Sequence, residues 1–337
     1  MESNACFLLI PMKKGCVPNL TPDQLRAILQ PEERYIGISM FDANEFSSLC
    51  TESQLSFSQL AAMGDFKSVL TCRSTFQGPH CSAPSTDKCL ASNHERGRVV
   101  VSVDTWNTIV DAVKPDLAVT MCDTIPLGAN QTRKQRAAKR RSELWNEACV
   151  KKQQNGNCLV VQPYTNDHSS GFVHSIPQSE NLLEFAVNLQ SLKLSSKSVS
   201  IGVAFSIPQL LASLVGRVEL IESTIPWDLA DKGIALVMDI NGDSDKPLSG
   251  VSEPQIDLNS AEFTYDIGPL CRDCTCYTCK RHHRAYIHHL LTVQEMNSSI
   301  LLVIHNLSRM AQLVRKYRTA TTDEARANIV KHVITQY

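Results

Sequence analysis

Short apolar runs rich in β-branched residues alternate along this chain with longer segments whose apolar residues recur at helical spacing. The runs predict buried strands, and the spaced segments predict helices with one apolar face. The predicted strands cover residues 99–101, 116–120, 158–161, 199–203 and 218–221. The predicted helices cover about 106–113, 132–152, 181–192, 207–215 and 322–334, and another begins at Thr21, where Thr, Pro, Asp and Gln in succession are typical of a capped first turn.

This alternation indicates the fold class. Strands separated by helices form βαβ units, which build a parallel sheet. The predicted strands are apolar throughout, which indicates that helices cover both faces of the sheet. An α/β barrel and an open doubly wound sheet both fit this pattern. The chain has no Gly-rich phosphate loop of the two common types, which argues against dinucleotide binding and nucleotide hydrolysis.

The character of the sequence changes after residue 240. Residues 241–259 are polar and contain four acidic residues and one lysine, which predicts a solvated acidic loop. Residues 233–238 and 261–265 are predicted as strands that link the α/β body to the segment that follows. Helix is predicted again after Lys280.

Composition and charge narrow the class of protein. The 337 residues include 33 Lys plus Arg and 34 Asp plus Glu, for a net charge of -1, which argues against a chain built mainly to coat nucleic acid. A hydrophobic content of 43% with 20% charged residues is typical of a globular protein with a real core. No apolar run reaches the roughly 18 residues of a membrane-spanning helix, and the first residues lack the basic start of a secretion signal. We therefore expect an intracellular protein.

The 13 cysteines fall into two groups. Nine are scattered between Cys6 and Cys158, as is usual for small buried hydrophobic residues in a reducing compartment. The other four lie within nine residues, and so tight a cluster indicates a metal site rather than disulfides. The clustered cysteines are Cys271, Cys274, Cys276 and Cys279.

Three thiolates and one imidazole make a tetrahedral site, for which Zn²⁺ is the usual metal. Cys274, Cys276 and Cys279 supply the thiolates on one turn, and a returning helix would deliver His305. Four protein ligands leave no position for water, which indicates a structural role. An all-cysteine set with Cys271 in place of His305 is the alternative. Four further histidines near the cluster also stay open as ligands: His282, His283, His288 and His289.

The motifs in this region occur in a specific order. Cys274-x-Cys276-x-x-Cys279 precedes Arg-Ala-Tyr-Ile-His-His-Leu-Leu at residues 284–291 and then His305-Asn-Leu, with 25 residues between Cys279 and His305. This order and spacing closely resemble the zinc module of tRNA-guanine transglycosylases. The resemblance implies a TIM-type (β/α)8 barrel with an inserted zinc-binding subdomain near the C-terminus. It also implies one structural Zn²⁺ on Cys274, Cys276, Cys279 and His305, without Cys271.

The resemblance covers roughly residues 60–310 and divides the chain into five parts. An N-terminal segment around the barrel covers residues 1–60, and the α/β barrel body covers 61–240. A polar acidic loop at 241–260 leads to the zinc-binding subdomain at 261–310. The C-terminal helix covers 311–337.

Members of this family exchange a base at a ribose carbon, and a nucleophilic aspartate holds the ribose covalently between the two steps. Residues 216–227 resemble the strand that carries this aspartate, but Glu222 stands in its place. The added methylene displaces the reacting oxygen by more than about 1 Å, which costs a positioned reaction roughly two orders of magnitude. We therefore expect no catalytic residue in this chain and a degenerate nucleophile position at Glu222.

Other positions of the family's site have also changed. In a loose alignment, Cys72 stands where a second aspartate belongs. Cys122 stands at the aspartate of the base pocket, and Asp123 follows one residue late, where it would point to the other strand face or cap a helix. Gln162-Pro163-Tyr164 replaces a Gln-Gly-Gly turn, so the backbone could not approach a flat base closely. Both cysteines are expected to be core thiols.

The whole pattern is similar to that of the non-catalytic subunits among the eukaryotic members of the family. This resemblance implies a heterodimer with a catalytic subunit of the same fold, or a homodimer of this chain in isolation. The heterodimer would exchange guanine for queuine at the tRNA wobble position, and the zinc module would contribute to the interface. The alternative is an active transglycosylase that uses Glu222 as its nucleophile. The resemblance also suggests a cytoplasmic protein with peripheral attachment to the mitochondrial outer membrane.

One predicted helix bears on RNA binding. Between residues 133 and 152 the chain has eight basic residues and two acidic ones. On a helix, four of the basic residues share a face and form a candidate track for tRNA phosphates. These candidate contacts are Arg133, Arg136, Lys139 and Arg140. A solvated helix face with Leu144 and Trp145 packed beneath it explains the same pattern.

Overall fold

We describe the fold from a computed structural model that covers residues 6–77, 85–94, 97–123, 132–153, 159–161, 172–173, 199–241 and 253–337. The predicted helix at 181–192 and the segment Gln162-Pro163-Tyr164 lie outside these described residues. Within them, no helix combines the length and the apolar character needed to cross a membrane.

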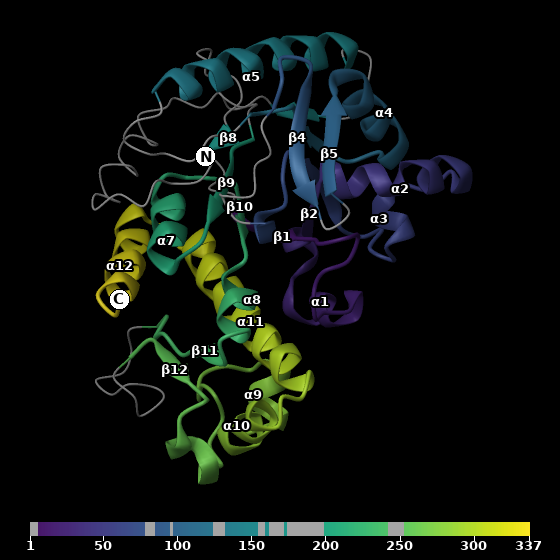
Figure 1. Ribbon diagram of the computed structural model, residues 1–337. Helices are drawn as coiled ribbons and strands as arrows, with labels where there is room; N and C mark the ends of the chain where they lie inside the picture. Colours follow the sequence, from purple (N-terminus) through teal and green to yellow (C-terminus); the bar gives the residue numbers. More distant parts are fainter. Residues whose placement is uncertain are drawn as a thin grey trace.

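Eight parallel strands form one curled sheet (Figure 1). Their order in the sheet is β7-β6-β3-β2-β1-β10-β9-β8, so β10, the last of these eight strands along the chain, pairs with the first, β1. Read in a circle, this is the sequential strand order of a (β/α)8 barrel. The strands are β1 (Phe7–Pro11), β2 (Tyr35–Ser39), β3 (Lys67–Thr71), β6 (Leu117–Val119), β7 (Leu159–Val161), β8 (Phe172–Val173), β9 (Ile201–Ala204) and β10 (Leu220–Ser223).

The sheet has the α/β class and the parallel direction that the sequence predicts. Across the part of the chain that the structure describes, no pairing joins β7 to β8. The structure thus shows a curled parallel sheet, and its closure into a full barrel stays a prediction. The N-terminal residues, expected around the barrel, instead supply β1 and β2 at the centre of the sheet. Both strands are only five residues long, too short for their pattern to separate them from a loop.

Helices pack on the sheet in the alternation that the sequence predicts. The helix that begins after Thr21 has the expected capping box, with Gln24 N–H donating to the Thr21 hydroxyl and Thr21 N–H donating to Gln24 Oε1. The helices of this part are α1 (Pro22–Ile28), α2 (Met40–Ser53), α3 (Phe57–Leu60), α4 (Val103–Val113), α5 (Thr132–Gln153), α7 (Ile207–Val215) and α8 (Ile225–Ala230).

The strand predicted at residues 99–101 exists, but its expected environment is wrong. It belongs to β5 (Gly97–Ser102), which pairs with β4 (Cys89–His94) in a separate antiparallel hairpin. Val101 is buried, whereas Val100 is 48% exposed. Three consecutive valines predict a strand, but the run cannot tell whether one face or both faces will be covered.

The C-terminal part begins with a small antiparallel pair, β11 (Ile234–Leu236) and β12 (Gln255–Asp257). β12 lies in the segment predicted as a loop, because its single buried residue, Ile256, gives no pattern. The prediction of a strand at Ala261–Tyr265 is wrong, since these residues form a 3-10 helix. Their alternating apolar residues imitate a strand, yet only Phe263 is buried.

Four helices complete this part: α9 (Tyr277–Arg281), α10 (Arg284–Thr292), α11 (Asn297–Thr319) and α12 (Asp323–Ile334). The long helix α11 runs diagonally from α9 and α10 toward the parallel strands (Figure 1). It packs against α8, α9, β11 and α1, and also contacts β1. This single helix therefore connects the C-terminal module to the sheet.

Candidate functional site

The cysteine cluster and His305 come together at the junction of α9 and α11. The ligand atoms of Cys274, Cys276, Cys279 and His305 all lie within 4.8 Å of one another. His305 Nδ1 is 3.3 Å from Cys279 Sγ and 3.6 Å from Cys276 Sγ. Cys276 is also the N-cap of α9, and its sulfur accepts from Cys279 N–H at 3.4 Å. The turn and the helix therefore hold four donors in a set that can bind a metal ion.

The orientation of the His305 ring favours this use. Its Nε2 lies 2.8 Å from the carbonyl oxygen of Leu236 in β11, to which it can donate a hydrogen bond. A proton on Nε2 leaves the lone pair of Nδ1 directed at the sulfurs, the usual support for a metal-binding histidine. Asn306 secures β11 by accepting from Leu236 N–H at 2.8 Å and donating to Ile234 O at 3.0 Å.

The pKa values of Cys276 and Cys279 shift in opposite directions. Hydrogen bonds from the Cys274 and Cys279 thiols lower the pKa of Cys276. Hydrogen bonds that join Cys279 to the Cys274 and Cys276 sulfurs raise the pKa of Cys279, and the bond with Cys274 has the larger effect. Three sulfurs beside one another cannot all ionise without a positive charge between them. A soft divalent cation would supply that charge, which fits the chemistry of the donor set.

Cys271 has a different environment. It is fully buried, and its thiol donates to Asp273 Oδ1 at 2.7 Å. Burial raises the pKa of Cys271 to about 12, so its sulfur keeps a proton. Asp273 in turn pairs with Arg309, whose guanidinium also donates to Met238 O. Cys271 thus belongs to a network beside the four donors rather than to the donor set.

The neighbouring histidines also have other roles in the described part of the chain. The His282 ring stacks on Tyr286 with 5.1 Å between ring centroids. His288 Nδ1 lies 2.8 Å from the carbonyl oxygen of Leu258. Neither His283 nor His289 belongs to the cluster of candidate ligands.

Glu222 lies in β10 at the carboxyl edge of the parallel sheet. Its side chain is buried, and one carboxyl oxygen accepts from the Thr75 hydroxyl at 3.1 Å. The same oxygen is 3.4 Å from the point where a Cβ on Gly37 would lie. Burial raises the pKa of Glu222 to about 8, although the bond from Thr75 lowers it. The carboxyl group is therefore mostly protonated at neutral pH.

Cys72 and Cys122 follow the ends of β3 and β6 at the same edge of the sheet. Both are buried, and the Cys72 thiol donates to Thr120 O at 2.8 Å. Burial raises the pKa of Cys122 to about 12 and that of Cys72 well above its usual range. Both thiols stay neutral, which fits the expectation of core residues.

Asp123 is held by an ion pair rather than by a helix end. Arg141 in α5 donates to Asp123 Oδ2 from Nε at 2.9 Å and from Nη2 at 2.5 Å. In the turn after β6, Asp123 N–H donates to the Ser142 hydroxyl oxygen at 2.9 Å. This carboxylate is thus engaged by its own chain.

The basic helix α5 presents its candidate residues to solvent. The side chains of Arg133, Arg136, Lys139 and Arg140 are all exposed. On the opposite side, Ala138, Ser142, Trp145 and Cys149 are buried. Leu144, expected beneath the helix, is 49% exposed instead. The helix therefore has one buried stripe and one basic, solvent-facing side.

A groove of about 840 Å³ lies between α1, α9, α10 and α11, beside the cluster of candidate ligands. Its lining includes Tyr277, His282 and Tyr286, which form a continuous set of ring contacts. Tyr277 is 58% exposed and Tyr286 is 38% exposed. Partly exposed aromatic residues around an apolar groove are a common feature of protein interfaces.

Two of these contacts join residues that are far apart in the sequence. Thr75 and Glu222 are separated by 147 positions, so no local pattern connects them. The carbonyl group of Leu236 carries no side-chain signal at all, because a backbone acceptor looks the same in every residue. The motif His305-Asn306 was the one available signal for this second contact.

Comparisons with known proteins agree with the geometry. Residues 193–337 match a sequence model of the family described as queuine tRNA-ribosyltransferase. Relatives called queuine tRNA-ribosyltransferase accessory subunit 2 match over most of their length. The protein of Anopheles gambiae is 21% identical over 96% of this chain and 82% of its own length.

Two further relatives with the same name come from distant organisms. The protein of Trichoplax adhaerens is 24% identical over 95% of this chain and 89% of its own. That of Schizosaccharomyces pombe is 26% identical over 90% of this chain and 71% of its own. With the ordered cysteine and histidine motifs and the parallel strand order, these matches show that the chain is similar to the queuine tRNA-ribosyltransferase family over residues 193–337 and to proteins named as its accessory subunits over most of its length.

Proposed function

We propose that this chain is a non-catalytic accessory subunit of a eukaryotic queuine tRNA-ribosyltransferase. It pairs with the catalytic subunit as a heterodimer, and the pair exchanges guanine for queuine at the tRNA wobble position. The chain helps to bind or position the tRNA. We place this work in the cytoplasm, with the peripheral attachment to the mitochondrial outer membrane that the family resemblance suggests.

The state of Glu222 carries the non-catalytic part of the proposal. A nucleophilic carboxylate must be ionised and must reach the substrate carbon. Glu222 is buried, and its pKa of about 8 keeps it mostly neutral at pH 7. The described residues give it one hydrogen bond, from Thr75, and no cation within ion-pair distance. Neutral thiols at Cys72 and Cys122 add no second acid or base.

The aromatic groove beside the metal cluster supports the pairing. The relatives are named accessory subunits, and an accessory subunit needs a surface for its partner. We assign the groove lined by Tyr277, His282 and Tyr286 to the catalytic subunit of the same family. A structural Zn²⁺ on Cys274, Cys276, Cys279 and His305 would hold α9 against α11 and so fix the shape of this groove.

The exposed side of α5 supports a role in tRNA binding. Arg133, Arg136, Lys139 and Arg140 face solvent, and among them the described ion pairs include only that of Lys139 with Glu143, at 4.0 Å. Exposed cations on one helix can each contact a phosphate, which is the sequence-independent part of RNA binding.

An incorporation assay tests the proposed function. Labelled queuine and substrate tRNA are given to this chain, to a catalytic subunit, and to both together. We expect incorporation only when the catalytic subunit is present, and more of it when both are present. Glu222→Gln should leave the rate of the pair unchanged, as should the control Glu219→Gln. Turnover by this chain alone that Glu222→Gln abolishes would instead establish the alternative, an active transglycosylase with Glu222 as nucleophile.

A further inference from the structure

Arg73 is unusual among the arginines that the structure describes. It follows β3, and its guanidinium lies over the Phe41 ring, with 5.9 Å between Cζ and the ring centroid. Nη1 donates to Ala91 O of the β4–β5 hairpin at 3.0 Å. Nε and Nη2 are buried from water and have no hydrogen-bond partner, and the same is true of the hydroxyl group of the next residue, Ser74.

Other largely buried arginines each pair with a carboxylate. These pairs are Arg34 with Asp65, Arg284 with Asp266, Arg309 with Asp273, and Arg326 with Asp323. Arg73 has no carboxylate within 4.0 Å among the residues that the structure describes. A buried cation without a counter-charge is strongly unfavourable, so this position calls for an anion from outside the chain.

The surroundings of Arg73 do not supply the missing charge. Asp123 interacts electrostatically with Arg73, but this carboxylate already accepts two hydrogen bonds from Arg141. The neighbouring thiols of Cys72 and Cys122 keep their protons, because burial raises the pKa of both. The set of charged groups at this end of β3 therefore has an excess of one positive charge.

The unpartnered edge of Arg73 indicates the kind of anion. Nε–H and one Nη2–H lie in the guanidinium plane and point the same way, which matches two oxygens of one carboxylate or phosphate group. Phe41 contacts the face of the guanidinium and not this edge, so the two N–H groups of the edge have no partner among the described residues. We propose that Arg73 binds a small free oxyanion, a carboxylate or a phosphate, through Nε and Nη2, with the Ser74 hydroxyl as a neighbouring donor. This site goes beyond the proposed function and does not depend on it.

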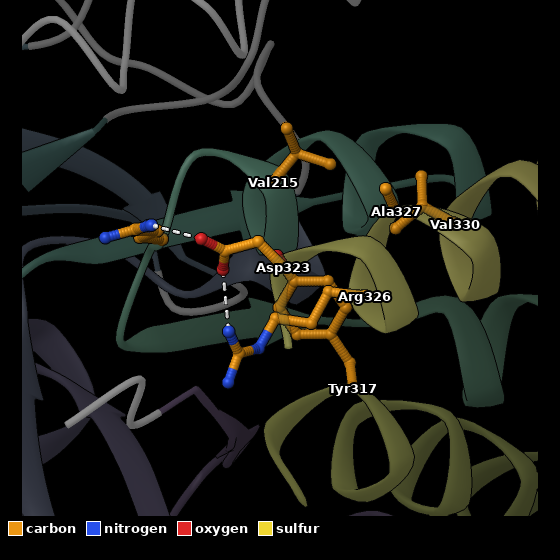
Figure 2. A pocket seen from close by; sticks show the side chains of 7 residues that line it. Val215, Tyr317, Asp323, Arg326, Ala327 and Val330 are labelled. Atoms are coloured by element: carbon orange, nitrogen blue, oxygen red, sulfur yellow. Dashed lines mark hydrogen bonds and ion pairs between the residues drawn. The ribbon is translucent and has the colours of Figure 1, made fainter. Parts of the chain in front are cut away.

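A second pair of arginines shows the contrast. A pocket of about 480 Å³ is lined by Val215, Arg217, Tyr317, Asp323, Arg326, Ala327 and Val330 (Figure 2). In it both guanidinium groups pair with the Asp323 carboxylate, Arg326 Nη1 at 2.7 Å and Arg217 Nη2 at 3.7 Å. The side chains of Arg217 and Asp323 are 49% and 77% exposed, so water solvates these charges and the pocket gives no comparable reason to expect an anion.

Thermal unfolding in the presence of anions tests the proposal. Inorganic phosphate or acetate replaces chloride at constant ionic strength, and the midpoint temperature of the full chain is followed. We expect a saturable rise with phosphate or acetate, since a ligand that binds only the folded state stabilises it. Arg73→Lys keeps the charge but loses the paired donors, and should bind the anion at least about tenfold more weakly. Arg34→Lys, the same change at an arginine that has its own carboxylate, should respond as the unmodified chain does.

Further arms keep the test decisive. Calorimetric titration of the unmodified chain with phosphate should give one site, and Arg73→Met, which removes the cation, should fold without an anion and ignore it. No saturable response of the unmodified chain, or an equal response in Arg73→Lys, would overturn the proposal. Phosphate that added tRNA displaces would also overturn it, because the ligand would then be a nucleic-acid phosphate. None of these readouts uses queuine incorporation, so failure here and failure of the proposed function can be told apart.

Discussion

The metal cluster and the carboxyl edge of the parallel sheet resemble the same family to different degrees. At the cluster, every donor type of the family's zinc module is present, and the four ligand atoms lie within 4.8 Å of one another. At the sheet edge, the strands are present but the acids have been replaced or engaged. Glu222 is mostly neutral, the thiols of Cys72 and Cys122 are neutral, and Asp123 is paired with Arg141.

The difference between the metal cluster and the sheet edge indicates that stability of the fold depends on the cluster more than on the acids of the sheet edge. Removing a ligand from the cluster would leave buried sulfurs without a cation and would loosen the contact between α9 and α11. Removing a charge from the sheet edge has the opposite consequence, since a neutral group is easier to bury than a carboxylate. A chain of this fold can thus lose the acids and keep the scaffold, but it cannot lose the candidate metal ligands in the same way.

The largest effect should come from removing a metal ligand. We expect Cys276→Ser to lose stoichiometric zinc, because loss of one of four donors should exceed the roughly 10–100-fold cost of changing an outer partner. Unfolding of the C-terminal module should then occur at lower temperature, since metal binding is coupled to folding. Metal analysis after dialysis, together with thermal unfolding, measures both. Cys271→Ser is the matched control and should keep its zinc; the reverse outcome would move the site to Cys271.

The second effect concerns Glu222 and pH. Its pKa is about 8 in the folded protein against a usual 4.5, so the folded state keeps a proton that the unfolded chain releases. The free energy of unfolding should therefore be highest below about pH 4.5, fall as the pH rises, and level off above about pH 8. Relative to Glu222→Gln, the unmodified chain should lose about 4 kcal/mol between pH 5 and pH 8.

Urea denaturation across this pH range measures the effect on stability. Thr75→Val sharpens the result, because it removes the hydroxyl group that lowers the Glu222 pKa and should extend the fall in stability to higher pH. Equal pH dependence in the unmodified chain and Glu222→Gln would mean that Glu222 is ionised when folded. The sheet edge would then retain a charge, and the contrast with the metal cluster would weaken.

The smallest effect should come from the partner surface. Tyr286→Ala should weaken pairing with the catalytic subunit by about 2 kcal/mol, the size expected for an aromatic anchor in an interface. Tyr265→Ala is a matched control, since Tyr265 is in the same module, is 89% exposed and does not line the groove. Analytical ultracentrifugation of the mixed subunits measures the dissociation constant. Equal losses in the two variants would mean that the groove beside the metal cluster does not bind the catalytic subunit.

Local patterns predicted much of the fold. The capped start at Thr21 and the alternation of apolar runs with amphipathic segments are both present in the structure. The errors have a common cause. Val100 is exposed, Ile256 belongs to a strand, and Ala261–Tyr265 form a 3-10 helix instead of a strand. The structure of such short segments depends on the residues that pack over them. Those neighbours are remote in sequence, and three to five residues do not encode them.

The sequence by itself determined the order of the elements and the residue types and spacing of the metal cluster, because these depend on local periodicity and on the chemistry of cysteine and histidine. Only the tertiary structure decided that Cys271 donates to Asp273, that Glu222 is buried against Thr75, and that the Nε–Nη2 edge of Arg73 has no partner. The physical reason is that charge state and hydrogen bonding depend on desolvation and on distances across the fold, and neither quantity is a property of a residue and its sequence neighbours alone.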